Sequence, residues 1–146
     1  MKKILFVASE GLPYIKSGGL ADVIGSLPQA IQKHGYQSDV VLPLYKKIKD
    51  KYQLEHLKQF NVQSGLINTS CDLYYQKHDG VDYYFIGNDK YFYRDEMYGY
   101  VDDGERFAFF CKAVCELLTN IDIKYNILLC NDWHTGMIPI MLKKEY

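Results

Sequence analysis

Three short, uninterrupted apolar runs lie along the chain, and the first and third of them lead into loops with polar side chains. They are Lys3 to Ala8 (K-I-L-F-V-A), Asp39 to Leu42 (D-V-V-L) and Ile127 to Cys130 (I-L-L-C). Runs of this length without polar alternation are typical of strands buried on both faces of a parallel sheet. We therefore expect three buried parallel strands, with the first run near the centre of the sheet.

A helical apolar pattern joins the first two runs. Spacings of three and four predict an amphipathic helix with an apolar stripe of Leu20, Val23, Ile24, Leu27 and Ile31. Pro28 interrupts this stripe and is expected to kink or divide the helix near Leu27, because proline removes a backbone donor and crowds the preceding turn. Gly35 has the position of a helix C-terminal glycine. The order strand, helix, strand predicts a right-handed βαβ unit.

The middle of the chain has a different pattern. Residues 55–63, 70–78 and 81–87 are alternating or rich in tyrosine, and Asp79-Gly80 between the last two is a strong signal for a type I′ hairpin turn. We expect antiparallel strands here, inserted into the sheet or added at its edge.

Two further helices are predicted. Asp102 and Asp103 stand where a helix cap belongs, ahead of an apolar face of Phe107, Phe110, Cys111, Val114, Leu117 and Leu118. A second helical stretch runs from Gly136 toward Lys144. The fold class is therefore α/β, a Rossmann-like parallel sheet flanked by helices with a β-hairpin insertion. A doubly wound sheet continues from such a last helix into another strand, so we expect the 146 residues to belong to a longer polypeptide.

Composition excludes several classes of protein. Hydrophobic residues make up 48% and charged residues 24%, which is ordinary for a globular domain. Seventeen Lys and Arg against 18 Asp and Glu provide no basic field that would gather nucleic acid or anionic lipid. The apolar runs are too short for a membrane span or a signal peptide, so we expect a cytoplasmic protein. The four cysteines form no C-x-x-C pair, and Cys111 and Cys115 lack further ligands for a metal, so we expect buried, reduced thiols.

The loop after the first strand carries an anion-binding pattern. In open α/β sheets ligands bind beyond the carboxyl ends of the strands. Here Lys16 and the pair Gly18-Gly19 precede a helix, whose N-terminus offers unpaired N–H groups and partial positive charge. This suits a phosphate, although a plain turn with a solvated lysine explains it as well. Glu10 is open to two interpretations, a ligand contact or a hydrogen bond within its own loop. The pattern is neither G-x-G-x-x-G nor a P-loop, which disfavours a nicotinamide-dependent reductase.

The loop after the third strand, N-D-W-H-T, places a carboxylate, an indole and an imidazole together. Asp132 is suited to accept sugar hydroxyls or to orient His134, and His134 to donate to a ligand oxygen, while Trp133 offers a stacking face. The alternative is that Asp132 or Thr135 caps the next helix and that His134 is satisfied by backbone.

Three segments, in order, resemble one enzyme family. M-K-K-I-L-F-V-A-S-E-G-L-P-Y-I-K-S-G-G-L-A-D-V-I-G-S-L-P resembles the N-terminus of bacterial glycogen synthases and plant starch synthases. R-D-E-M-Y-G-Y-V-D-D-G-E-R-F-A-F-F resembles the stretch before that family's next long helix, and N-D-W-H-T-G resembles its aspartate-tryptophan-histidine loop. Together they span nearly the whole chain.

The resemblance implies a glycosyltransferase B architecture of two facing Rossmann-like domains. It implies glucose transfer from ADP-glucose to the non-reducing end of an α-1,4-glucan such as glycogen, with retention of configuration and without a metal or organic cofactor. Residues 1–146 then form part of the N-terminal domain, and the C-terminal nucleotide-binding domain is absent. The family's main catalytic histidine and its nucleotide-holding arginine, lysine and glutamates have no counterpart in this sequence, so the fragment alone is expected to be inactive.

The resemblance also assigns roles to individual residues. Those near the donor diphosphate and sugar are Lys16, Gly18, Gly19, Asp22 and Tyr98, and those in supporting catalytic positions near the transferred glucose are Asp132 and His134.

A second hypothesis remains open, a non-catalytic glycan-binding module that uses the tyrosine-rich hairpins. It requires Tyr83 and Tyr84 to face the glycan.

Overall fold

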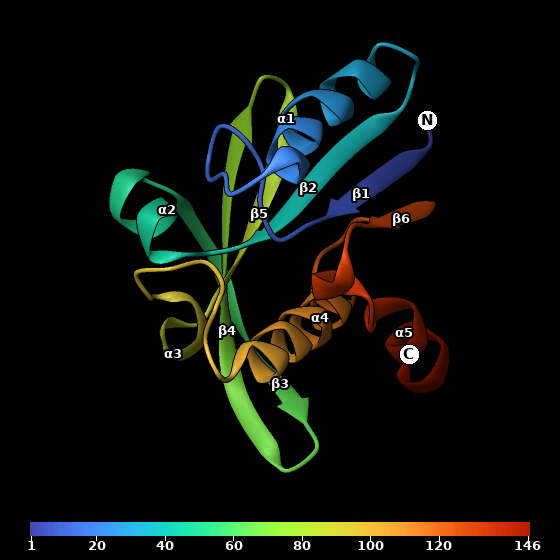
Figure 1. Ribbon diagram of the computed structural model, residues 1–146. Helices are drawn as coiled ribbons and strands as arrows, with labels where there is room; N and C mark the ends of the chain where they lie inside the picture. The colour runs from blue at the N-terminus through green and yellow to red at the C-terminus, as the bar shows by residue number, and fades with distance from the viewer.

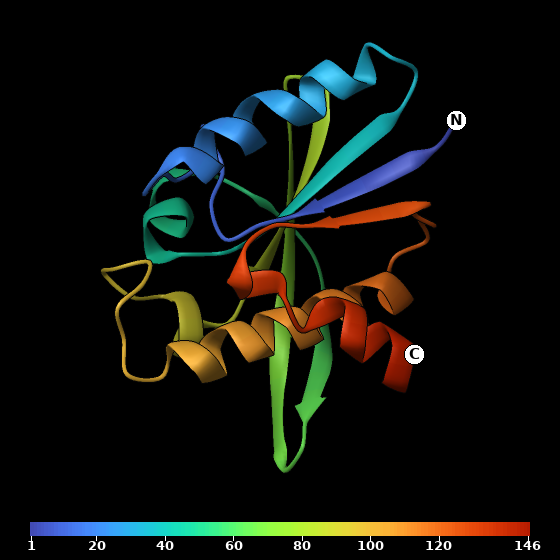
Figure 2. The same cartoon turned by 45° about the vertical axis from the view of Figure 1, so that its right-hand side comes forward.

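The computed structural model describes residues 1–146, which form one mixed six-stranded sheet with helices on both faces (Figures 1 and 2). The strands are β1 (Lys3–Val7), β2 (Gln37–Pro43), β3 (Glu55–Ser64), β4 (Ile67–His78), β5 (Val81–Gly87) and β6 (Ile127–Cys130). The helices are α1 (Gly19–Gln32), α2 (Lys46–Lys51), α3 (Asp89–Phe92), α4 (Asp103–Asn120), the 3-10 helix η1 (Trp133–Thr135) and α5 (Ile138–Glu145). Figure 2 shows α1 over one face of the sheet and α4 with α5 over the other.

The parallel part of the sheet confirms the predicted fold class. The strand order is β3-β4-β5-β2-β1-β6, and β5, β2, β1 and β6 are mutually parallel. Leu5, Phe6 and Val7 of β1 are fully buried because helices cover both faces of this strand. The prediction of a buried third strand is wrong for β6, where Ile127 is 44% and Leu129 39% exposed. β6 pairs with β1 alone and is an edge strand, a position that the apolar pattern does not reveal.

The antiparallel part also forms as predicted. β3 pairs with β4 and β4 with β5, and Asp79 (φ 49°) and Gly80 (φ 77°) both have the positive φ of a type I′ turn. The β3–β4 hairpin extends beyond the rest of the sheet (Figure 2). Tyr83 is 0% and Tyr84 6% exposed, so both pack inside the protein. The tyrosines that the glycan-binding hypothesis requires at the surface are therefore part of the core.

Helix α1 corrects two expectations. It continues without a break through Pro28, which is buried, so the predicted division near Leu27 is wrong. Packing of Ala21, Ile24 and Pro28 against the sheet supports the helix across the missing backbone donor. The predicted apolar stripe is buried only in part, because Val23 is 46% and Leu27 36% exposed.

Helix α4 begins where predicted, but without the predicted cap. The carboxylate of Asp102 receives two hydrogen bonds from the Arg94 guanidinium, at 2.7 and 2.8 Å, instead of bonding to the helix. Asp103 accepts from the backbone N–H groups of Gly99 and Tyr100, which fixes the turn before the helix. These ionic and turn contacts replace the N-cap.

Burial also determines the state of the thiols. All four cysteines are free, and Cys71, Cys111 and Cys115 are buried. Burial raises the pKa of Cys111 to about 11 and that of Cys71 and Cys115 to about 12, so these thiols stay protonated at neutral pH. No helix combines the length and apolarity that crossing a membrane requires.

Candidate functional site

The two loops that sequence analysis selected leave the sheet side by side. β1 and β6 are parallel neighbours, with Val7 paired to Cys130 at their carboxyl ends. Asn131 donates from its backbone N–H and from Nδ2 to the carbonyl of Val7, each at 3.0 Å. Ser9-Glu10 and Asn131-Asp132 therefore begin at adjacent points on one edge of the sheet.

The glycine pair at the start of α1 is open to the outside. Gly18 is the N-cap residue, with φ −153° and no side chain to bond the first turn. A Cβ at Gly18 or Gly19 would meet no atom within 4 Å, and neither residue has positive φ. By contrast, a Cβ at Gly25 would lie 2.9 Å from Leu12 Cβ. The fold therefore requires glycine at 25 but not at 18 or 19, and the first amides of α1 lie where a ligand can approach closely.

Lys16 forms an ion pair in place of the plain solvated lysine that the sequence also allowed. Its Nζ donates to both carboxylate oxygens of Asp22 at 2.7 and 2.9 Å, and both side chains are about half exposed. An exposed ion pair of this kind contributes at most ~1 kcal/mol. A strongly anionic ligand at the α1 N-terminus can therefore draw Lys16 away from Asp22 at little cost.

The side chain of Glu10 fixes the two residues that precede α1, Ser17 and Gly18. It is 5% exposed, and its Oε2 accepts from the N–H groups of Ser17 at 2.9 Å and Gly18 at 2.8 Å. Its Oε1 accepts from the Tyr98 hydroxyl at 2.9 Å. Of the two interpretations left open by the sequence, the bond within its own loop is correct, and the bond to Tyr98 is an addition that the sequence did not predict.

Tyr98 lies between the two loops. Its hydroxyl is 2.7 Å from Ser9 Oγ as well as bonded to Glu10, and its ring centroid is 4.8 Å from that of His134. Burial is the main reason that the pKa of Tyr98 lies above its usual value. The phenol therefore stays protonated and donates.

Asp132 has a strained backbone. Its φ of 67° and ψ of 177° lie in a region that is almost confined to glycine, and such a conformation costs about 1–3 kcal/mol. Its Oδ1 accepts from the Trp133 N–H at 2.9 Å, so the predicted capping contact forms. The rest of this exposed carboxylate remains available to a ligand.

His134 is buried, and its ring is stacked against Trp133 with centroids 3.9 Å apart. Its Nδ1 is buried without a hydrogen-bond partner, so the expectation that backbone satisfies the ring is wrong. Burial lowers the pKa of His134, which makes the imidazole neutral at pH 7. A neutral imidazole carries one donor and one acceptor nitrogen, so the ring can take part in a hydrogen bond with a ligand in either role.

Sequence analysis missed Arg106, which holds the loop that carries Tyr98. This guanidinium is fully buried; it donates to the carbonyls of Tyr91 at 2.7 Å and Met97 at 3.0 Å and to Asp103 at 2.8 Å. The only sequence signal was a charged residue beside the apolar face of a helix, which is usually solvated.

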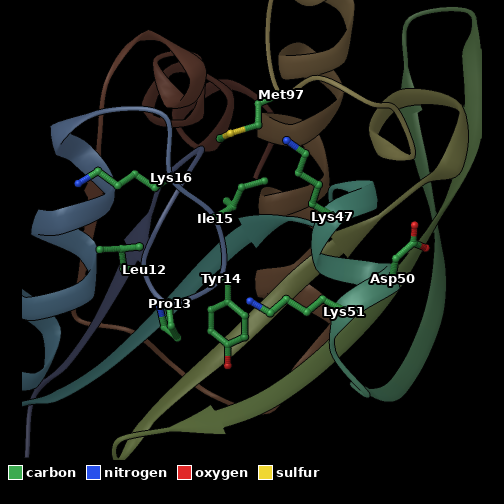
Figure 3. Close-up of a pocket in the computed structure, with 9 residues that line it drawn as sticks. All are labelled: Leu12, Pro13, Tyr14, Ile15, Lys16, Lys47, Asp50, Lys51 and Met97. Atoms are coloured by element: carbon green, nitrogen blue, oxygen red, sulfur yellow. The ribbon is translucent and has the colours of Figure 1, made fainter.

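The largest cavity, about 570 Å³, lies between the loop after β1, which includes Lys16, and helix α2 (Figure 3). Its apolar wall includes Leu12, Ile15 and Met97, and Lys47 and Lys51 project from α2. Figure 3 shows Lys16 directed away toward α1. A smaller cavity of about 180 Å³ is bordered by Gly104, Phe107, Ala108, Cys111, Trp133, His134 and Met137.

The arrangement combines an anion site with groups that bind hydroxyls. Free amides at the start of α1 and the Lys16 ammonium suit phosphate, while Asp132, Tyr98 and His134 offer acceptors and donors for a sugar. Through Glu10, the structure joins Gly18 to Tyr98 and, by ring contact, to His134. No group of three or more His, Cys, Asp or Glu side chains is arranged to hold a metal.

Comparisons with known proteins identify the family of this chain. The family model described as the starch synthase catalytic domain matches residues 3–146. Glycogen synthases of Clostridium kluyveri and Anoxybacillus flavithermus are 51% and 44% identical over 99% of this chain, which covers 31% and 30% of their lengths. The structure is also similar to the catalytic domain of starch synthase IV from Arabidopsis thaliana bound to ADP and acarbose, with TM-score 0.86 and 27% identity over 99% of this chain and 31% of that one. The chain thus spans about a third of the length of these relatives, and it belongs to the starch synthase catalytic domain family.

Proposed function

We propose that this chain is the N-terminal Rossmann-like part of a glycogen synthase that uses ADP-glucose. The full-length enzyme, completed by a C-terminal nucleotide-binding domain, transfers glucose to the non-reducing end of an α-1,4-glucan with retention of configuration, in the cytoplasm and without a cofactor. The names of the relatives support this proposal, as does the similar starch synthase structure bound to ADP and acarbose. Four free cysteines agree with a reducing compartment.

One observation carries the proposal. Gly18 and Gly19 have neither the positive φ nor the crowded neighbours that make glycine necessary for a fold. Side chains are absent at the positions where they would shield the first amides of α1. Close approach of an external anion explains this absence, and the donor diphosphate is such an anion.

We assign the residue roles from the family resemblance, and the geometry supports them. Lys16 and the amides after Gly18 bind the diphosphate of the donor, and Asp22 holds Lys16 until the donor binds. Tyr98 and His134 form the wall beside the sugar, and Asp132 accepts its hydroxyls. These groups supply only part of the positive charge that a departing diphosphate needs. We therefore place the remaining cations in the C-terminal domain.

The test is glucose incorporation by the full-length enzyme. Purified protein is incubated with glycogen and radiolabelled ADP-glucose, and precipitated glycogen is counted; residues 1–146 alone serve as the matched control. We expect incorporation by the full-length enzyme only, with label released by β-amylase, because retention creates new α-1,4 links. Absence of incorporation by the full-length enzyme would refute the proposal.

The glycan-binding hypothesis predicts a different result. A binding module retains residues 1–146 on a glycogen column without any transfer by the full-length protein. The burial of Tyr83 and Tyr84 removes the contact surface on which that hypothesis depended.

A further inference from the structure

The carboxylate of Glu10 is buried at the carboxyl end of β1, and no cation neutralises it. Its donors are two backbone N–H groups, of Ser17 and Gly18, and one phenol, of Tyr98. None of the ion pairs in the structure includes Glu10. A carboxylate at 5% exposure with only neutral donors is costly for a fold, so stability alone does not explain this residue.

The Glu10 carboxylate accepts from all three donors at once. Both of its oxygens accept, one from the two amides and the other from Tyr98. A glutamine at position 10 that kept its oxygen on the two amides would turn its NH₂ group toward Tyr98, and the phenol would then accept from residue 10 and donate to Ser9 Oγ instead. The bond that the phenol donates to residue 10 therefore depends on the glutamate carboxylate.

These contacts connect parts of the site that are distant in sequence. Gly18 is 8 residues from Glu10, and Tyr98 is 88 residues away. The amides that Glu10 binds belong to the last residues before α1, so it fixes the direction in which the following amides of Gly19 and Leu20 point. Through Tyr98, whose ring packs on His134, it also fixes the opposite wall.

We propose that Glu10 is a positioning residue that holds the donor-binding amides and Tyr98 in one geometry for glucose transfer; this inference rests on the proposed function. Charge and geometry then act in opposite directions. The Glu10 carboxylate repels a donor diphosphate, whereas its hydrogen bonds orient the groups that bind it. Loss of the charge alone would tighten donor binding, and loss of the hydrogen bonds that orient the amides and Tyr98 would slow glucose transfer.

The deciding variant is Glu10→Gln in the full-length enzyme, which keeps the size and removes the charge and one acceptor. We expect kcat to fall by at least about tenfold, while KM for ADP-glucose changes by less than about threefold, because lost repulsion and lost orientation offset each other. Glu96→Gln is the matched control, since Glu96 is exposed in the loop that carries Tyr98. It should leave both constants unchanged.

Tyr98→Phe provides a second, independent measurement. It removes the hydroxyl that bonds Glu10 and keeps the ring on His134. If Glu10 acts through Tyr98, the double variant should lose little more kcat than Glu10→Gln alone, and this non-additivity separates positioning from a general effect on folding. It also keeps the test decisive if Glu10→Gln fails to fold, because Tyr98→Phe must then lower kcat in protein that circular dichroism shows to be folded.

The two proposals fail in different ways. A wild-type enzyme that transfers no glucose overturns the proposed function, whatever Glu10 does. An active wild type with unchanged kcat in Glu10→Gln, or with tighter donor binding and normal kcat, overturns the role of Glu10 and leaves the proposed function intact.

Discussion

Gly19→Ala separates the requirements of the fold from those of the ligand. Gly19 is the first residue of α1, and a Cβ there would meet no atom within 4 Å. Alanine is the better helix former and restricts the unfolded chain, so this change should raise the free energy of unfolding by ~0.5 kcal/mol. On stability alone, the substitution is favourable.

The same methyl group should weaken binding of the donor. It projects into the space through which a phosphate reaches the first amides of α1. Losing one hydrogen bond to a charged group costs about 1.5–3 kcal/mol, which corresponds to a ten- to hundredfold rise in KM for ADP-glucose. Stability and donor binding therefore move in opposite directions.

The assay pairs urea denaturation with glucose incorporation by the full-length enzyme. Ser26→Ala is the matched control, because Ser26 is exposed on the same helix and bonds only to backbone carbonyls of α1. It should stabilise α1 by a similar amount without changing KM. If Gly19→Ala is more stable than wild type and has a normal KM, glycine at 19 is not reserved for a ligand and our reasoning about this pair is wrong.

Four further predictions follow from particular contacts. Lys16→Ala should raise KM for ADP-glucose more than it lowers kcat, and full activity in this variant would remove Lys16 from the site. Asp132→Gly and Asp132→Ala both lose the bond from the Trp133 N–H and should both lose transfer activity, but the glycine variant should have the higher free energy of unfolding, by about 1–3 kcal/mol in urea denaturation, because glycine relieves the strained backbone. Arg106→Met should lower the free energy of unfolding by about 3 kcal/mol or more, because the carbonyls of Tyr91 and Met97 lose this donor and Asp103 loses its cation; a change below about 1 kcal/mol would contradict the role of Arg106 in holding the loop. Burial lowers the pKa of His134, so the contribution of its neutral ring to stability is complete above about pH 6.5 and is lost as pH falls from there toward the folded-state pKa. The difference in free energy of unfolding between wild type and His134→Gln should therefore change over this pH range, and a constant difference would show that the pKa of His134 is not lowered by folding.

The apolar pattern predicted the parallel sheet because a strand that is buried on both faces has an uninterrupted run of apolar residues. β1 and β2 carry such runs and are buried as expected. β6 carries a similar run but lies at the edge of the sheet, with Leu129 39% exposed. A run of apolar residues indicates that both faces of a strand are suited to burial, but it does not indicate whether another strand pairs with its free edge. The number of strands on that side was therefore beyond the reach of the pattern.

Helix α1 shows a second limit. Pro28 removes one hydrogen bond, and the local rule predicts a break there. Packing of Ile24 and Pro28 on the sheet outweighs this loss, and the helix continues to Gln32. Tertiary burial decided the outcome, and such burial is known only once the sheet is in place.

The candidate site was predictable as a set of residues, but not as a set of contacts. Motifs selected Lys16, Asp132 and His134, whereas the pairing of Lys16 with Asp22 and the bond from Tyr98 to Glu10 emerged from the structure. Glu10 and Tyr98 are 88 residues apart, and no local pattern marks a hydrogen bond over that separation. The sequence therefore selected candidate groups, and the structure showed that one buried carboxylate bonds both Gly18 and Tyr98.

The glycines differ in the structure in ways that a sequence motif does not show. The chain has eleven, and in the sequence they are equivalent. In the structure most have positive φ or a neighbour that a Cβ would crowd, and the exceptions are Gly18, Gly19 and Gly104. Gly18 and Gly19 begin α1, and Gly104, in the first turn of α4, borders the small cavity beside His134. Every glycine without a structural reason therefore lies at a helix N-terminus next to the candidate site, where a missing side chain leaves room for a ligand.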